Sequence, residues 1–526
     1  MFSLPPSMRN DRVYVRRWPA LFVLSMALLM VVAANVSLTV AVTDIQQKLH
    51  GMTSETRWIL DAYPLTVASL LLLFGAAGDR YGRRLALNLG LVGFGAASVF
   101  AALSTTPGEV IAARTLLGVS GALIMPATLA YVRVLFPPSE RMTALTIWSA
   151  SSGLAVTVGP LASGALIGPL GWQAVFWLNV PVALILLILS ALTIPASRNE
   201  SAPRLDALGA LLATAVFAPL TYGIIEGPTY GWLSAHVLGA FAIATIALAL
   251  FVAWERHVAA PMLDLAWFKN RGFGMGAGLL ALGFTVMIGI VYVSVLFLQQ
   301  HELHGPLRTG IELLPLGAGI LAGAAANGPV VGRFGIRLPV VTGLLMLAAG
   351  SAVLALAHSG YLPVAMALAV VGLGAGLWLP NLADAVLNGT PLQASGVAGA
   401  TGDAAVELGS ALGIALLGSV LTSGYHSRLP VASSHLPAAA HSAVSDGLLG
   451  AHAVATKLPA PQAQRLASVA DSAFVHGLTL AAIVAAGVAL ASALLAIRMP
   501  RHVTAADADT GDLDARAVMD LAAAAA

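Results

Sequence analysis

The stretch G-A-A-G-D-R-Y-G-R-R occupies residues 75–84 and is the most informative part of the sequence. It separates two long apolar runs and carries four charges within ten residues. Because an apolar run of about 20 residues can cross a bilayer as a helix, the stretch is predicted to join two neighbouring membrane helices. A connection this short cannot form a domain.

Composition points to a protein that crosses the membrane many times. Of 526 residues, 58% are apolar and 10% are charged, whereas roughly 25% are charged in soluble domains. The absence of cysteine excludes disulfides, iron–sulfur clusters and thiol chemistry. A net charge of +2 without a basic run gives no sign of nucleic-acid binding. The chain has no Gly-Lys dipeptide and therefore no P-loop, so an ion gradient or a partner would drive any pumping, and no cofactor is expected.

Apolar runs along the chain predict fourteen membrane helices. The expected spans cover residues 18–42, 58–78, 85–108, 110–132, two within 142–197 divided at 168–172, 207–225, 227–254, 272–301, 313–332, two within 338–383 divided at 358–360, 397–424 and 472–497. Residues 425–471 are predicted to form an external loop containing a helical hairpin, and residues 498–526 a disordered cytoplasmic tail.

The distribution of basic residues predicts the orientation. With both termini in the cytoplasm, 19 of the 26 Lys and Arg residues fall on the cytoplasmic side, six fall outside, and Arg114 lies within a span. Short cytoplasmic loops carry an excess of such residues. The chain is therefore expected in the cytoplasmic membrane with both termini inside.

An internal repeat indicates how the spans are grouped. The pattern Gly328-x-x-x-Gly332-Arg333-Phe334-Gly335-Ile336-Arg337 echoes residues 75–84, but it joins the tenth and eleventh spans. An offset of eight helices fits two six-helix bundles with two helices inserted between them. The predicted domains are a bundle at 1–200, the inserted pair at 201–258 and a second bundle at 259–526.

Residues 75–84 resemble the signature Gly-x-x-x-Asp-Arg-x-Gly-Arg-Arg of the major facilitator superfamily. With the repeat and the count of spans, the chain resembles the fourteen-helix drug:proton antiporters, an all-α polytopic membrane fold. The resemblance implies transport by alternating access. It also implies a conformational switch, in which the loop packs near the start of the thirteenth helix and Asp79 faces the positive end of that helix. The implied switch residues are Gly75, Asp79, Arg80, Gly82, Arg83 and Arg84.

Two further stretches resemble exporters of quaternary ammonium compounds and methyl viologen. One is Trp58-Ile-x-Asp61-x-Tyr63-x-Leu at the start of the second span, and the other is residues 402–409 in the thirteenth. The fifth span matches the antiporter motif of the superfamily at Gly159, Pro160 and Gly164, although Ala155 and Ser163 replace usual glycines. The alternative is an ordinary membrane helix rich in Gly and Pro.

Carboxylates inside the predicted spans are the candidate coupling residues. The family usually has an Asp in the first helix, but Ala34 occupies that position here. Glu407 lies near mid-membrane, with Asp403 one turn away on the same face. Burial and the like-charged neighbour disfavour ionisation, so the pair is expected to exchange protons near neutral pH. A pair held neutral for structural reasons is the alternative.

Asp61 and Arg114 have similar predicted depths and are expected to pair, either as a structural ion pair or in coupling. Asp61 would attract a cationic substrate. Asp384 is placed near the inner end of the twelfth span, where it could reach water.

Substrate and partners are predicted only as chemical classes. Trp58, Tyr63, Trp148 and Trp378 are candidates to line a cavity for lipophilic cations, although most such residues pack helices or face lipid. Irregularly spaced histidines in the 425–471 loop make a metal site improbable, and none is predicted. The predicted function is proton-coupled export of amphipathic, cationic compounds by a monomer.

Two kinds of alternative remain. An exporter of one metabolite or antibiotic would share the same fold. A channel or a membrane enzyme is the alternative from another class. An enzyme would need a clustered catalytic set or a large domain outside the membrane, and the sequence suggests neither.

Overall fold

The computed structural model describes residues 16–49, 53–195, 206–258, 261, 263–391, 394–429, 444 and 447–501. Every regular element in these ranges is a helix. Fourteen helical segments are long and apolar enough to cross a membrane, which confirms the predicted count. The linker at 196–205 and the tail from 502 lie outside the described residues.

The first six spans form the first half of the molecule. Its helices are α3 (Arg17–Lys48), α4 (Thr53–Tyr81), α5 (Arg83–Leu103), α6 (Pro107–Leu135), α7 (Pro138–Leu170), α8 (Gln173–Trp177) and α9 (Asn179–Thr193). The short helices α8 and α9 together make the sixth span. Thr106 begins α6 with a capping box that also uses Glu109, which satisfies backbone amides at the helix start.

The inserted pair consists of α10 (Ala207–Tyr230) and α11 (Ala235–Glu255). The second half contains η1 (Leu265–Lys269), α12 (Arg271–Leu296), the π-helix η2 (Phe297–His301), α13 (Pro306–Glu312), α14 (Leu314–Phe334), α15 (Arg337–Leu354), α16 (Leu362–Asn388), α17 (Ser395–Arg428), α20 (Leu448–Ala455) and α21 (Ala460–Ala496).

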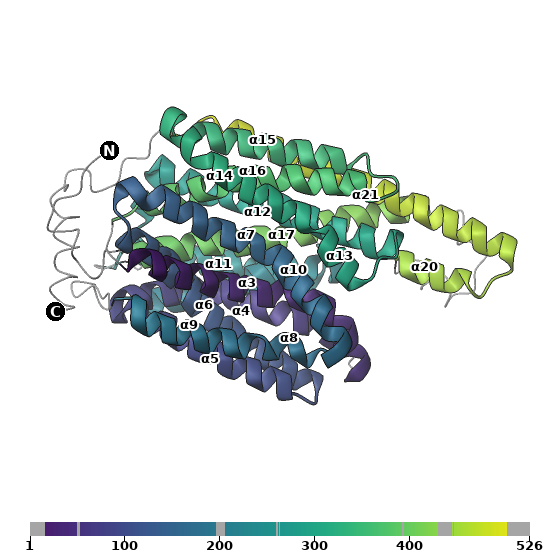
Figure 1. The fold of residues 1–526 in the computed structure, drawn as a ribbon, viewed down its shortest axis with the longest axis horizontal. Coiled ribbons are helices and arrows are strands. Elements are labelled where there is room, and N and C mark those ends of the chain that lie inside the picture. The colour runs from purple at the N-terminus through teal and green to yellow at the C-terminus, as the bar shows by residue number, and fades with distance from the viewer. Residues whose placement is uncertain are drawn as a thin grey trace.

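The helices run roughly side by side (Figure 1). We call the end of the bundle that carries residues 75–84 the motif end. The opposite end is the hairpin end, because α20 and the start of α21 project there beyond the other helices (Figure 1). Helix α10 packs against α4 and α17, and α11 packs against α10, so the inserted pair touches both halves.

Two predicted boundaries were wrong. The turn between the seventh and eighth spans lies at residues 231–234, because α10 continues through Glu226 to Tyr230. The fourteenth helix begins at Ala460 and not at Ser472. An apolar run marks only the part of a helix that is in lipid, whereas residues 460–471 favour helix and are polar enough to extend into water. The predicted external loop is shorter as a result.

Candidate functional site

Arg114 is a buried charge that joins three helices of the first half. Its side chain is 1% exposed. Nε donates to the Ile59 carbonyl at 2.9 Å, and Nη2 donates to the Leu60 carbonyl at 3.2 Å and to Asn35 Oδ1 at 2.9 Å. The guanidinium carbon lies 4.6 Å from the ring centre of Tyr63, within cation–π range. These contacts offset the cost of burying the charge.

The expected pairing of Asp61 with Arg114 takes a different form. Asp61 acts on the guanidinium electrostatically, whereas the hydrogen bonds of Arg114 go to two carbonyls and to Asn35. Asn35 follows Ala34, the position where the family usually has its first-helix carboxylate. A neutral amide therefore contacts the arginine from α3.

The two carboxylates of α17 face the second span of the first half. Asp403 is buried, and its Oδ2 has no hydrogen-bond partner among the described residues. Glu407 is half-buried and interacts electrostatically with both Asp403 and Tyr63. The Tyr63 hydroxyl donates to the Val31 carbonyl at 3.2 Å. A row of ionisable groups therefore runs from Arg114 through Tyr63 to Glu407, from the first half to the second.

At the motif end, Asp79 of the first half forms hydrogen bonds with the second half. Its Oδ2 accepts from the amides of Gly396 at 2.8 Å and Val397 at 3.2 Å, at the first turn of α17. Its Oδ1 accepts from Arg83 Nε at 2.9 Å and Nη2 at 2.7 Å. The carboxylate thus occupies the positive end of the helix, as predicted. A Cβ on Gly75 would lie 2.7 Å from the Gly396 carbonyl oxygen, so glycine permits this contact.

Two further arginines join the halves at the motif end, and sequence reasoning missed their contacts. Arg133 Nη2 donates to the Thr390 carbonyl at 2.7 Å, and Nη1 donates to the Pro391 carbonyl at 3.0 Å. Arg141 Nη1 donates to Asn388 Oδ1 at 3.0 Å. Both arginines are buried.

Asp384 was placed wrongly near water. It is buried, accepts from Asn388 Nδ2 at 2.8 Å, and interacts electrostatically with Arg133 and Arg141. The position of Asp384 directly after the apolar run 338–383 gave no hint of the two arginines, because they belong to the other half.

The antiporter motif of α7 packs tightly on both sides. A Cβ on Gly159 would lie 2.7 Å from the Ala33 carbonyl oxygen of α3, and one on Gly164 would lie 2.9 Å from Leu307 Cα of α13. Pro160 lies inside the helix between these glycines. The halves therefore also touch at the hairpin end.

The candidate aromatic residues do not share one cavity in this structure. Trp58 stacks on Tyr222 with 6.2 Å between ring centres. Trp148 is buried and donates to Thr128 Oγ1 at 3.1 Å. Trp378 is fully buried beside Phe284, with 5.5 Å between ring centres. Their role in binding substrate stays a prediction.

Two cavities differ in size and place. One of about 10 Å³, space for about one water molecule, lies between the halves, where α7 faces α14 and α16. The halves touch on both sides of it, through Asp79 at the motif end and Gly164 at the hairpin end. A larger crevice of about 340 Å³ lies away from the carboxylates, between the turn after α10 and helices α17 and α21.

Within the described residues, no group of three or more His, Cys, Asp or Glu side chains could hold a metal ion. His452 lies 3.1 Å from Asp471, which it contacts through Nε2. His435 and His441 lie outside the described residues.

Fourteen helices able to cross a membrane, with buried charges between them, define a polytopic helical membrane protein. The sequence model of the Major Facilitator Superfamily matches residues 22–414, and the chain belongs to this family. The human organic anion transporter MFSD10 (TETRAN) has a similar crystal structure, with a TM-score of 0.59 over 94% of this chain and all of that chain. At 17% identity, this likeness supports the fold alone.

Similar proteins export drugs and antibiotics. The tetracenomycin C resistance and export protein of Streptomyces glaucescens is 33% identical over 492 residues, covering 92% of this chain and 91% of that protein. The multidrug efflux pump LfrA of Mycolicibacterium smegmatis is 33% identical over 488 residues, covering 92% and 96%. The chain is thus a membrane transporter in a family of drug and antibiotic efflux proteins.

Proposed function

We propose that this protein exports amphipathic cations in exchange for protons, by alternating access between bundles 1–200 and 259–526. The observation that carries the proposal is the position of Glu407. It is a half-buried carboxylate in the middle of α17, facing Tyr63 of the opposite half. An ionisable residue within a span is costly and is commonly part of an ion or substrate pathway.

In this mechanism Glu407 binds a proton and the cation in turn. The anion attracts an organic cation from the cytoplasmic side, and protonation from outside neutralises the carboxylate and releases the cation. Asp403 lies one turn away and interacts electrostatically with Glu407, so the two like charges disfavour ionisation of both carboxylates at once. Asp61 serves substrate entry or exit, and Arg114 positions Tyr63 beside Glu407.

The switch for this cycle lies at the motif end. The hydrogen bonds of Asp79 with the first turn of α17 and with Arg83 close the cytoplasmic side. Arg133 and Arg141 add contacts there. These contacts should favour the state open to the outside. Breaking them opens the cytoplasmic side, while the close packing of Gly164 on Leu307 closes the other.

The test measures efflux of a monovalent lipophilic cation, and proton movement, in everted vesicles. Glu407→Gln mimics the protonated form and should abolish proton-driven efflux with normal membrane insertion. Glu109→Gln is the matched control, because Glu109 is partly exposed at the start of α6 and glutamine preserves the capping box. If Glu407→Gln still moves protons on drug addition while Asp61→Asn does not, the coupling site is Asp61.

A second candidate is export of one antibiotic that carries no net charge. It is favoured by the relative named for tetracenomycin C. Glu407→Gln should then leave efflux of a neutral antibiotic largely intact. Resistance profiles of an exporter-deficient host, with cationic biocides and neutral antibiotics side by side, distinguish the two candidates.

The proposed orientation places the hairpin end outside the cell. Because the chain has no cysteine, single cysteines can be labelled cleanly. An impermeant thiol reagent added to intact cells should label Ser468→Cys, an exposed position of α21, and should not label Tyr81→Cys, which is exposed at the motif end. The opposite pattern would reverse the orientation.

A further inference from the structure

The crevice at the hairpin end has walls of two chemical kinds. Its volume is about 340 Å³, and it is bounded by the turn after α10 and by the outer faces of α17 and α21. The apolar walls are Leu416, Val420 and Leu480. Ser419, Ser423 and Ser427 recur every four residues and form a polar stripe along one face of α17.

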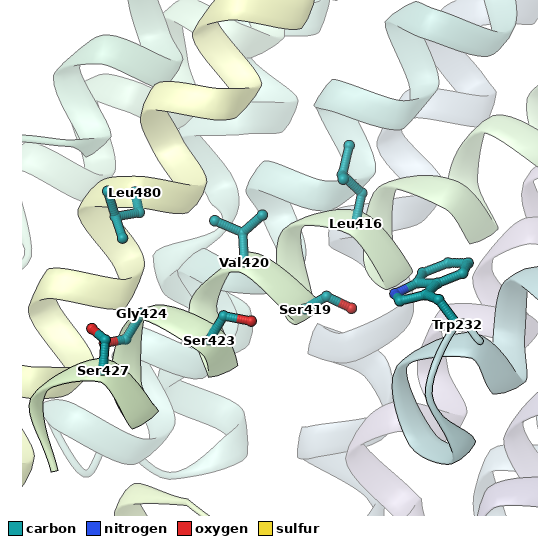
Figure 2. Close-up of a pocket in the computed structure, with 8 residues that line it drawn as sticks. All are labelled: Trp232, Leu416, Ser419, Val420, Ser423, Gly424, Ser427 and Leu480. Atoms are coloured by element: carbon teal, nitrogen blue, oxygen red, sulfur yellow. The ribbon is translucent and has the colours of Figure 1, made fainter. Parts of the chain in front are cut away.

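Two groups in the crevice are suited to donate hydrogen bonds. The Ser419 hydroxyl oxygen is buried and has no hydrogen-bond partner among the described residues. In Figure 2, the hydroxyl of Ser419 and the indole nitrogen of Trp232 point toward one another across the crevice. The Trp232 ring packs on Gly227, where a Cβ would lie 2.6 Å from the ring, so its position is fixed. A buried donor without a partner is costly, and an acceptor on a bound molecule would remove that cost.

The crevice is separate from the proposed transport pathway. Ser423 follows Glu407 by sixteen residues, so at 3.6 residues per turn it points roughly 160° away from it around α17. The lining contains no residue of the first half and no charged side chain. A cation that passes between the two halves would find neither access nor a counter-charge there.

We propose that the crevice binds an acyl chain of a phospholipid in the leaflet at the hairpin end, with the ester carbonyl accepting from Ser419 and Trp232. Tryptophan is enriched at the level of the bilayer interface, where ester groups lie. The acyl chain then packs on Leu416, Val420 and Leu480. Helix α10 packs on α17, and the crevice lies beside this contact. The bound lipid would therefore lie at the border between the inserted pair and the second half.

The experiment uses the full chain in vesicles of phosphatidylethanolamine and phosphatidylglycerol, doped with a phospholipid that carries a photoreactive diazirine near the acyl carbonyl. After illumination and proteolysis, mass spectrometry should find labelled peptides from residues 416–427 and around Trp232. Ser419→Phe, which fills the crevice, should lower this labelling about tenfold. Ser419→Ala, which removes only the hydroxyl, should lower it severalfold.

Leu238→Phe is the matched control, because Leu238 is exposed on α11 near the same end and does not line the crevice. It should leave labelling unchanged. Size-exclusion profiles show whether each variant is folded, and Ser419→Ala keeps the test valid if Ser419→Phe is not. Absent labelling of the wild type, or equal labelling in wild type and both Ser419 variants, overturns the proposal. Displacement of the lipid by excess tetraphenylphosphonium also overturns it, because the crevice would then bind substrate.

Discussion

Residues 75–84 and 328–337 have related sequences and lie at the same end of the molecule, but they differ in how two corresponding positions meet the other half. Asp79 accepts from two amides of α17, and Gly75 lies against its backbone. At the corresponding positions, Gly332 and Gly328 are exposed, and a Cβ on either would meet nothing within 4 Å. The carboxylate of Asp79 and the close approach of Gly75 therefore join the halves in a way that Gly332 and Gly328 do not.

The two stretches share a local role. Gly82 has φ 120° and Gly335 has φ 74°, so each turn uses a conformation that favours glycine. Arg84 donates to the Ala191 carbonyl on the last span of the first half, and Arg337 donates to the Met499 carbonyl just after the last span of the second. Both halves therefore share the glycine turn and the hydrogen bond from arginine to a backbone carbonyl. The contact of Asp79 with the other half is found in the first stretch.

The largest expected effect comes from removing the carboxylate. Asp79→Ala removes the carboxylate that accepts from Arg83 and from two amides of α17, a loss of about 3–5 kcal/mol for a buried pair. Transport should fall to near background while the protein still inserts in the membrane. Efflux assays at matched expression measure this loss.

Gly332→Asp is the comparison variant, since it places a carboxylate at the exposed equivalent position. It should keep transport within about twofold, because a solvated charge interacts weakly. Equal losses in Asp79→Ala and Gly332→Asp would contradict the asymmetry between the two loops.

A smaller effect is expected from replacing the first glycine of each stretch with alanine. Gly75→Ala would place Cβ 2.6 Å from the Ala400 Cβ, so α4 and α17 must move apart at an expected cost of about 1–3 kcal/mol. Gly328→Ala meets nothing and should be neutral or slightly stabilising, since alanine favours helix. Thermal unfolding in detergent, read together with efflux, compares the pair. A neutral Gly75→Ala would show that the close approach is unnecessary.

Sequence was sufficient for the count of spans, the repeat and the position of Asp79, because each rests on local hydropathy or on a motif. It was insufficient for Arg133, whose described acceptors include the carbonyls of Thr390 and Pro391. Every residue has a backbone carbonyl, so no pattern of side chains in the sequence predicts which carbonyl accepts a hydrogen bond. The sequence also did not predict the burial of Asp384, because its neighbours Arg133 and Arg141 come from the other half. The cavity of aromatic residues stays a prediction, since Trp378 packs beside Phe284 and Trp148 donates to Thr128 in the described residues.

The smallest expected effect tests what the loops share. Arg84→Ala and Arg337→Ala each remove a hydrogen bond from a guanidinium to a backbone carbonyl within one half. The bond of Arg84 is exposed and that of Arg337 is partly buried, so each should contribute about 0.5–1.5 kcal/mol. Both variants should lower the midpoint of thermal unfolding by a few degrees and keep efflux within about twofold. Because neither arginine crosses between the halves through these bonds, the two losses should be similar. If Arg84→Ala abolished efflux while Arg337→Ala did not, the difference between the loops would extend beyond Asp79 and Gly75 to the anchor itself.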